Sequence, residues 1–114
     1  MLQYALKLGG YTYRSYADGN AALEAMLVMR TGSSRPVVLL DVDLPGLDGH
    51  SLHERLRVER PGAFVVVFVS VHAAEGDQVR ALNAGAWDYL AKPLNLRVLL
   101  AKLPVWLARA AEET

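Results

Sequence analysis

Three polar side chains of different chemistry each follow an apolar stretch of the chain: Asp41 carries a carboxylate, Ser70 a hydroxyl and Lys92 an ammonium group. Together they suit a phosphoryl group, because a carboxylate can accept it, a hydroxyl can donate a hydrogen bond to it and a cation can neutralise its charge. Pro93 follows the lysine directly, and a cis bond before it would turn the lysine inward. These residue types predict a phosphoryl-transfer site if the fold brings them together.

Two short apolar runs, residues 37–40 and 64–69, end directly before Asp41 and Ser70. Both runs are apolar at successive positions, which is typical of strands that are covered on both faces, as in a parallel sheet. Weaker strand patterns cover residues 11–16 and 87–91, and the second of these ends directly before the lysine. Open α/β sheets bind ligands beyond the carboxyl ends of their strands, so we expect the polar residues to share one edge of the sheet.

Helical periodicity fills the intervals between these strands. The expected helices cover residues 18–30, 50–59, 75–84 and a stretch from about residue 95 onward. Asp18 or Asn20 can cap the first of them. Pro104 lies inside the last helical pattern, and an interior proline costs ~3 kcal/mol, so we expect a kink or a break there. The alternation of strands and helices predicts an α/β fold with right-handed crossovers.

The composition excludes several functional classes. The chain has 12 Lys+Arg against 12 Asp+Glu, so it lacks the basic excess of proteins that bind nucleic acids or anionic membranes. It has no cysteine, which excludes disulfides and thiolate chemistry. Its apolar runs are far shorter than the ~20 residues that span a bilayer, and no signal-peptide pattern opens it. We expect one cytoplasmic domain covering residues 1–114.

Three motifs, taken in chain order, resemble the receiver domain of response regulators in two-component signalling. Asp41 is followed by a Leu-Pro pair at residues 44–45 and by an Asp-Gly pair at residues 48–49, which opens a helix. Ser70 matches the family's Ser/Thr position. Residues 85–93 match its block from Gly-Ala through Tyr to Lys-Pro. The resemblance covers almost the whole chain and implies a flavodoxin-like, doubly wound parallel sheet.

The resemblance implies a switch module rather than an enzyme. Asp41 would take a phosphoryl group from a histidine kinase or a phosphotransfer protein, with Mg²⁺ assisting, and Ser70 and Lys92 would contact the phosphate. Tyr89 matches the aromatic position that reports the switch. The implied metal residues are Asp41 and Asp43. The signal would leave through the last helix and strand to a downstream effector protein.

The first residues depart from the family's pattern. Receivers begin with a strand that ends in paired acids, and these acids hold the magnesium. Residues 1–8 instead resemble the end of the first helix, and residues 9–11 a turn into the second strand. We therefore expect an N-terminally truncated receiver without its first strand and part of its first helix. The expected consequences are weak Mg²⁺ binding, partly compensated by the Asp43 carboxylate, and open strand edges that favour a homodimer.

Two alternative functions remain open from the sequence. A receiver without its acidic pair could be a degenerate, non-phosphorylated module that binds another protein. The run from Val37 to Asp43 also resembles the Asp-x-Asp start of haloacid-dehalogenase-like phosphatases, but Leu44 and Pro45 stand where that family needs a threonine. Uptake of phosphate from a small acyl-phosphate donor would distinguish a phosphorylated switch from a degenerate receiver.

The histidines and tryptophans allow both structural and functional interpretations. His50 and His53 lie three apart on an expected helix and could ligate a metal, but without a third ligand we expect a solvated pair. His72 is expected in a loop at the rim of the site. Trp87 and Trp106 could pack on the core or mark a contact patch near the last helix.

Overall fold

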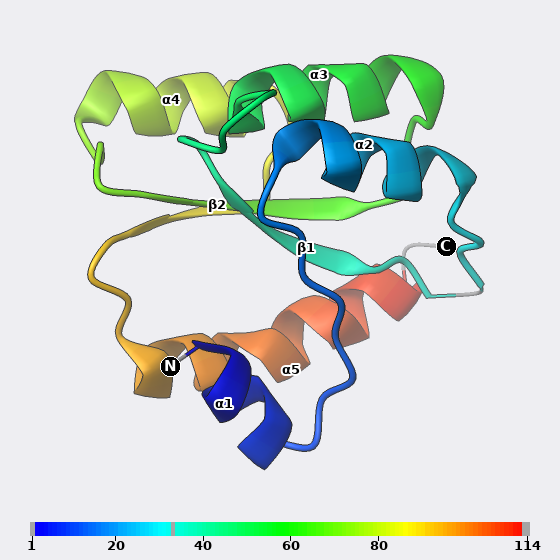
Figure 1. Cartoon of the computed structure of the whole chain (residues 1–114). Helices are drawn as coiled ribbons and strands as arrows, with labels where there is room; N and C mark the ends of the chain where they lie inside the picture. The colour runs from blue at the N-terminus through cyan, green and yellow to red at the C-terminus, as the bar shows by residue number, and fades with distance from the viewer. Residues whose placement is uncertain (1, 33, 113–114) are drawn as a thin grey trace.

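The structure, a computed structural model, describes residues 2–32 and 34–112 (Figure 1). Its elements are α1 (Leu2–Leu8), α2 (Gly19–Val28), β1 (Val37–Asp41), α3 (Gly49–Glu59), β2 (Val65–Ser70), α4 (Glu75–Asn83), β3 (Asp88–Ala91) and α5 (Leu96–Glu112). Within the described ranges, the strands form one parallel sheet in the order β1-β2-β3. Helices α2, α3 and α4 cover one face, and α1 and α5 cover the other (Figure 1). The predicted α/β architecture is confirmed.

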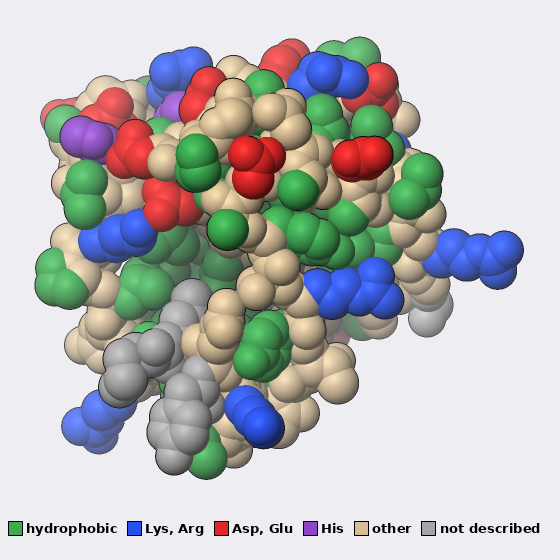
Figure 2. Space-filling view, in the orientation of Figure 1, with side chains coloured by type: hydrophobic (Ala, Val, Ile, Leu, Met, Phe, Trp, Pro, Cys, Tyr) green, Lys and Arg blue, Asp and Glu red, His purple; other side chains and the backbone are tan. Residues whose placement is uncertain are grey.

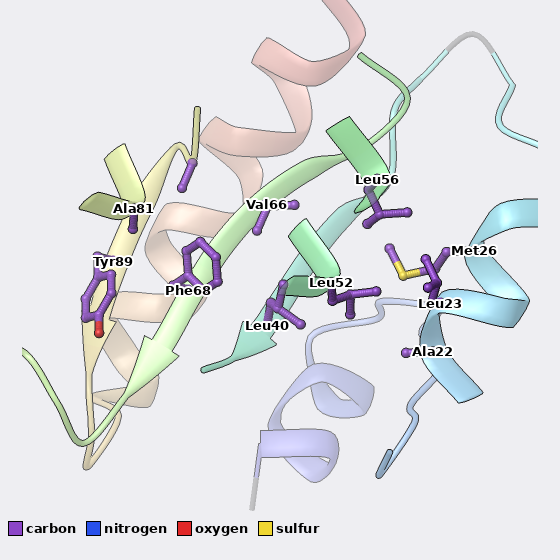
Figure 3. Packing of buried hydrophobic residues seen from close by; sticks show 11 residues of the cluster. Ala22, Leu23, Met26, Leu40, Leu52, Leu56, Val66, Phe68, Ala81 and Tyr89 are labelled. Carbon is purple, nitrogen blue, oxygen red and sulfur yellow. The ribbon is translucent and has the colours of Figure 1, made fainter. Parts of the chain in front are cut away.

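The central strand β2 is the most deeply buried element, with all six of its residues buried. It pairs with β1 on one side and β3 on the other, and helices cover both of its faces, so it needs the continuous apolar run that the sequence shows. Phe68 of β2 and Leu52 of α3 are fully buried in the larger core cluster (Figure 3). This cluster lies between the sheet and the layer formed by α2, α3 and α4.

The opposite face of the sheet packs on α5. Val67 of the central strand contacts a cluster that contains Leu99, Leu103 and Trp106 of that helix. Trp106 therefore packs on the core. The helix continues through Pro104 to its end, so the expected break is wrong. The buried side chains on both sides of the proline hold the helix against the sheet, and this packing offsets the backbone hydrogen bond that the proline removes.

Residues 11–16 form no strand, so the strand predicted there is also wrong. A strand exists only where a neighbour presents a hydrogen-bonding edge, and this segment pairs with no strand of the described sheet. It instead connects α1 to α2 and is mostly exposed. The side-chain amide of Gln3 donates to the hydroxyl of Ser15 at 3.0 Å, and Tyr11 packs against the cluster on α5.

The other expected elements are confirmed with small shifts of their ends. Helices α2, α3 and α4 and the weak strand β3 all appear near their expected positions. The carboxylate of Asp18 accepts the backbone N–H groups of Asn20 and Ala21, which identifies Asp18 as the cap of α2. Asp48 caps α3 by accepting from the backbone of Ser51 at 2.9 Å. None of the helices in the described ranges combines the length and the hydropathy that crossing a bilayer requires.

Candidate functional site

Asp41 and Lys92 meet at the carboxyl-end edge of the sheet. Asp41 is the last residue of β1, and Lys92 directly follows β3. The backbone N–H of Lys92 donates to the carbonyl of Ser70 at 2.8 Å, which extends the ladder between β2 and β3. The Lys92 ammonium donates to Asp41 Oδ2. The structure thus brings together the carboxylate and the cation that the sequence predicts for one site.

The Asp41 carboxylate is held in its ionised form. Partial burial acts to raise its pKa, but the hydrogen bonds from Lys92 and from the Asp43 backbone, together with the lysine's charge, hold the pKa below its ordinary value. The Asp43 N–H donates to Asp41 Oδ1 at 2.9 Å. The side chains of Asp41 and Lys92 are 33% and 37% exposed, so solvent and a small donor can reach them. An ionised, accessible carboxylate is the form that can act as a nucleophile.

Ser70 ends the central strand, between the strands that carry Asp41 and Lys92. It is fully buried, and its Oγ accepts the backbone N–H of His72 at 2.9 Å. A serine hydroxyl that accepts in this way still has its own proton to donate. The third predicted residue therefore lies at the same edge of the sheet.

His72 links Ser70 to Tyr89. The Tyr89 hydroxyl donates to the backbone carbonyl of His72, whose N–H is bound to Ser70. The Tyr89 ring is buried, and its centroid lies 6.2 Å from that of Phe68. The sequence predicts His72 only at the rim of the site and does not reveal this link. Its position two residues after a serine was the available signal, because serine hydroxyls often bind the backbone at that distance.

Asp43 supplies a second carboxylate beside Asp41. Its Oδ2 lies 3.3 Å from Nε2 of His72, and both side chains are more than half exposed. Among residues 2–32 and 34–112, no group of three or more His, Asp or Glu side chains is placed to hold a metal. Mg²⁺ commonly keeps several waters and binds through one or two carboxylates plus phosphate oxygens. Asp41 and Asp43 have the ligand type that such a largely hydrated ion takes, and among the described residues they are not part of a dedicated cage.

Two glycines allow the β1–α3 loop to pack closely. The N–H of Gly49 donates to the carbonyl of Val42 at 2.9 Å, and a Cβ at position 49 would lie 2.4 Å from the carbonyl oxygen of Asp41. The N–H of Gly19 donates to the carbonyl of Pro45 at 2.9 Å. The start of α3 and the start of α2 therefore both position the loop that carries the second carboxylate.

The two helix histidines do not form the solvated pair that the sequence predicts. His53 is only 6% exposed, and the ring centroids of His50 and His53 lie 4.8 Å and 5.4 Å from that of Phe68. Burial lowers the pKa of both histidines, and the positive charge of Arg57 adds to the effect at His53. A neutral imidazole packs as an aromatic ring, which explains why α3 can turn this face toward the core.

The chain matches the family model described as the response regulator receiver domain over residues 1–104, so it belongs to the response-regulator receiver family. It is 39% identical over 103 residues to the transcriptional regulatory protein TcrA of Mycobacterium tuberculosis. The matched region covers 90% of this chain and 39% of TcrA. It is also 39% identical over 107 residues to the transcriptional regulatory protein CseB of Streptomyces coelicolor, covering 94% and 43% of the two chains. The chain spans less than half the length of these curated relatives.

Solved receiver structures confirm the flavodoxin-like fold. A CheY-like receiver domain protein of Methanospirillum hungatei superposes with a TM-score of 0.84 at 29% identity, covering 99% of this chain and 86% of that one. The receiver domain of the sensor histidine kinase PA1611 of Pseudomonas aeruginosa gives a TM-score of 0.77 at 30% identity, covering 94% and 85%; its structure has a magnesium ion in the active-site cleft. Receiver domains are signalling modules that interact with histidine kinases and effectors. The family match does not favour the phosphatase alternative.

Proposed function

We propose that residues 1–114 form one cytoplasmic receiver domain that serves as the phosphoacceptor switch of a two-component phosphorelay. Asp41 takes the phosphoryl group, and a histidine kinase or a phosphotransfer protein supplies it. The observation that carries the proposal is the contact between the Lys92 ammonium and the ionised Asp41 carboxylate at the carboxyl-end edge of the sheet. A carboxylate and a cation in contact at this edge, where α/β sheets bind ligands, support the roles of nucleophile and charge-neutralising group.

The proposed transfer is a single displacement. An oxygen of Asp41 attacks phosphorus and forms the P–O bond of an aspartyl phosphate, while the P–N bond to the donor histidine breaks. The donor nitrogen leaves with the bonding electron pair and takes up a proton. Negative charge then lies on the phosphoryl oxygens. The Lys92 ammonium exchanges its contact with the carboxylate for a contact with one of these oxygens, and the Ser70 hydroxyl donates a hydrogen bond to another. The chain itself releases no product, which separates this role from that of an enzyme.

Asp41 and Asp43 are the residues that would hold Mg²⁺. When bound, the ion would neutralise part of the charge on the phosphoryl oxygens. With only these two carboxylates, we expect weak binding in the absence of phosphate. The position of Asp43 beside His72 means that the same carboxylate also contacts the loop after β2.

The proposed switch runs through His72. A phosphoryl group that draws the Ser70 hydroxyl toward itself also acts on His72, because the His72 N–H is bound to that hydroxyl. The carbonyl of His72 holds the inward-facing Tyr89 hydroxyl, so a shift of the loop reaches β3. Tyr89 would then report phosphorylation to a downstream effector that contacts the face formed by β3 and α5.

Labelling by a small acyl-phosphate donor in the presence of Mg²⁺ tests the proposal. The wild-type chain should take up one phosphoryl group, and Asp41→Asn should take up none. Asp48→Asn is the matched control, because asparagine also caps helices and the same loop is kept intact. Labelling that survives in Asp41→Asn would refute the assignment. A folded wild-type chain that takes up no phosphate would instead identify a degenerate receiver.

A further inference from the structure

Two side chains of different ligand chemistry meet across the carboxyl-end edge of the sheet. Asp43 lies in the loop after β1, two residues beyond Asp41, and His72 lies in the loop after β2, two residues beyond Ser70. Oδ2 of Asp43 and Nε2 of His72 are 3.3 Å apart. Figure 2 shows histidine and acidic side chains gathered together at the surface. A carboxylate oxygen and an imidazole nitrogen both bind metal ions, so the pair has the composition of a two-ligand site.

The separation of the two atoms matches that of two ligands on one zinc ion. Zn²⁺ binds histidine nitrogen and carboxylate oxygen at about 2.0–2.2 Å with tetrahedral geometry, which places two such ligand atoms about 3.4 Å apart. Asp43 Oδ2 and His72 Nε2 are 3.3 Å apart. Ordinary N–H···O hydrogen bonds are shorter, at about 2.7–3.2 Å. The two atoms therefore need little movement to bind the same ion.

Both side chains are open to solvent, while their backbones are held in place. The side chains of Asp43 and His72 are 54% and 62% exposed, so a hydrated ion can reach them. The N–H of Asp43 donates to Asp41 Oδ1, and the N–H of His72 donates to Ser70 Oγ. The carbonyl of His72 accepts from the Tyr89 hydroxyl. None of these bonds uses the two ligand atoms, so an ion can bind without breaking them.

The imidazole decides which class of ion the pair prefers. Mg²⁺ favours oxygen ligands and keeps several waters, whereas imidazole nitrogen suits Zn²⁺, Ni²⁺ and Cu²⁺. Over residues 2–32 and 34–112, no three His, Asp or Glu side chains are grouped to hold a metal, and the Asp41 carboxylate is held by Lys92. Water molecules would therefore complete the coordination. A pair of this kind gives selectivity for an imidazole-binding ion together with moderate affinity.

We propose that Asp43 and His72 bind Zn²⁺, or a similar imidazole-binding divalent ion, in preference to Mg²⁺. Asp43 Oδ2 and His72 Nε2 are the protein ligands, and water fills the remaining positions. The ring is then neutral, with its proton on Nδ1. The bound ion joins the loop after β1 to the loop after β2.

The two histidines of α3 are placed less well for such an ion. His53 is only 6% exposed, His50 is partly buried, and both rings pack against Phe68. The nearby carboxylate of Asp48 is engaged as the helix cap, because it accepts from both the N–H and the hydroxyl of Ser51. His72 is therefore the imidazole that an ion from solvent reaches most easily.

Binding at this pair has a consequence for the switch, and that consequence rests on the proposed phosphoacceptor function. Zn²⁺ on Asp43 occupies a carboxylate assigned to Mg²⁺, and it also holds His72, whose backbone binds both Ser70 and Tyr89. At a Zn²⁺ concentration tenfold above the Kd, about nine-tenths of the chains carry the ion. Acyl-phosphate labelling at fixed Mg²⁺ should then slow by about fivefold or more in the wild-type chain.

Titration of the chain with Zn²⁺ alone and with Mg²⁺ alone, without a phosphate donor, tests the site. Calorimetry at one pH gives the two affinities, and NMR of the imidazole rings identifies the histidine that binds. The wild-type chain should bind Zn²⁺ at least about tenfold more tightly than Mg²⁺, and the His72 ring signals should shift.

Two glutamine variants separate metal ligation from a purely structural role. His72→Gln keeps the backbone hydrogen bonds and a polar side chain beside Asp43, but it removes the imidazole. It should bind Zn²⁺ at least about tenfold more weakly and change Mg²⁺ affinity by less than about twofold. His50→Gln is the matched control and should leave Zn²⁺ affinity unchanged.

The outcomes distinguish the metal site from the phosphoacceptor function. Equal Zn²⁺ affinity of His72→Gln and the wild type, or zinc-dependent shifts at His50 or His53 instead of His72, would refute the metal site. A wild-type chain that binds Zn²⁺ through His72 but takes up no phosphate would remove the phosphoacceptor function and leave the metal site standing. Labelling at Asp41 without any Zn²⁺-dependent shift at His72 would remove the metal site alone.

Discussion

Replacement of Gly49 by alanine should damage both stability and phosphate uptake, because this glycine lies against the phosphoacceptor strand. An added Cβ would be 2.4 Å from the carbonyl oxygen of Asp41 and 2.9 Å from the Cα of Val42. Both contacts are with backbone, which cannot rotate away, so the start of α3 must separate from the end of β1. Overpacking of this kind costs about 1–3 kcal/mol. The gain from replacing a helical glycine by alanine, about 0.5–1 kcal/mol, offsets only part of that cost.

Gly76 provides a matched control in the first turn of α4. A Cβ at this position meets nothing within 4 Å, so Gly76→Ala should stabilise the fold by about 0.5–1 kcal/mol. Urea unfolding gives the free energy of each variant, and acyl-phosphate labelling gives the rate of phosphate uptake. Gly49→Ala should lower both quantities, and Gly76→Ala should leave labelling unchanged. Equal unfolding free energies for the two variants would refute the argument from close backbone packing.

Three further outcomes follow from individual side chains. The pKa of His53 is lowered in the folded state, so the unfolded chain takes up a proton at this residue first as the pH falls. The unfolding free energy should therefore be highest above the ordinary pKa of histidine and should decrease as the pH drops below it. His53→Phe should weaken this pH dependence in urea unfolding at several pH values. Lys92→Met should change the unfolding free energy by less than about 1 kcal/mol, because the pair with Asp41 is partly exposed, but should strongly slow acyl-phosphate labelling. Tyr89→Phe loses the hydrogen bond to the His72 carbonyl and should lower thermal stability by about 0.5–1.5 kcal/mol without preventing labelling.

The positions of the site residues could be predicted from sequence because they depend on strand ends. A continuous apolar run identifies a strand covered on both faces, and the next polar residue then lies at the carboxyl-end edge. This argument placed Asp41 and Ser70 at one edge, a weaker strand pattern placed Lys92 there, and the structure has all three at that edge. It needed only local patterns, because parallel strands all end at the same edge of the sheet.

The failures share a different cause, which is tertiary context. The β-prone residues 11–16 form no strand because strand formation depends on a neighbouring edge, and composition does not reveal whether one is available. Helix α5 continues through Pro104 because it packs along the sheet on both sides of that residue. His53 is buried because Phe68, on the neighbouring strand β2, offers a ring to pack against. Local periodicity contains none of this information.

Burial divides the site into a fixed part and an accessible part. Ser70 is fully buried at the end of a strand whose backbone is paired on both sides, so its hydroxyl provides a rigid reference point. Asp41 ends one outer strand and Lys92 directly follows the other, and both side chains stay about one-third exposed, which lets a donor reach the carboxylate.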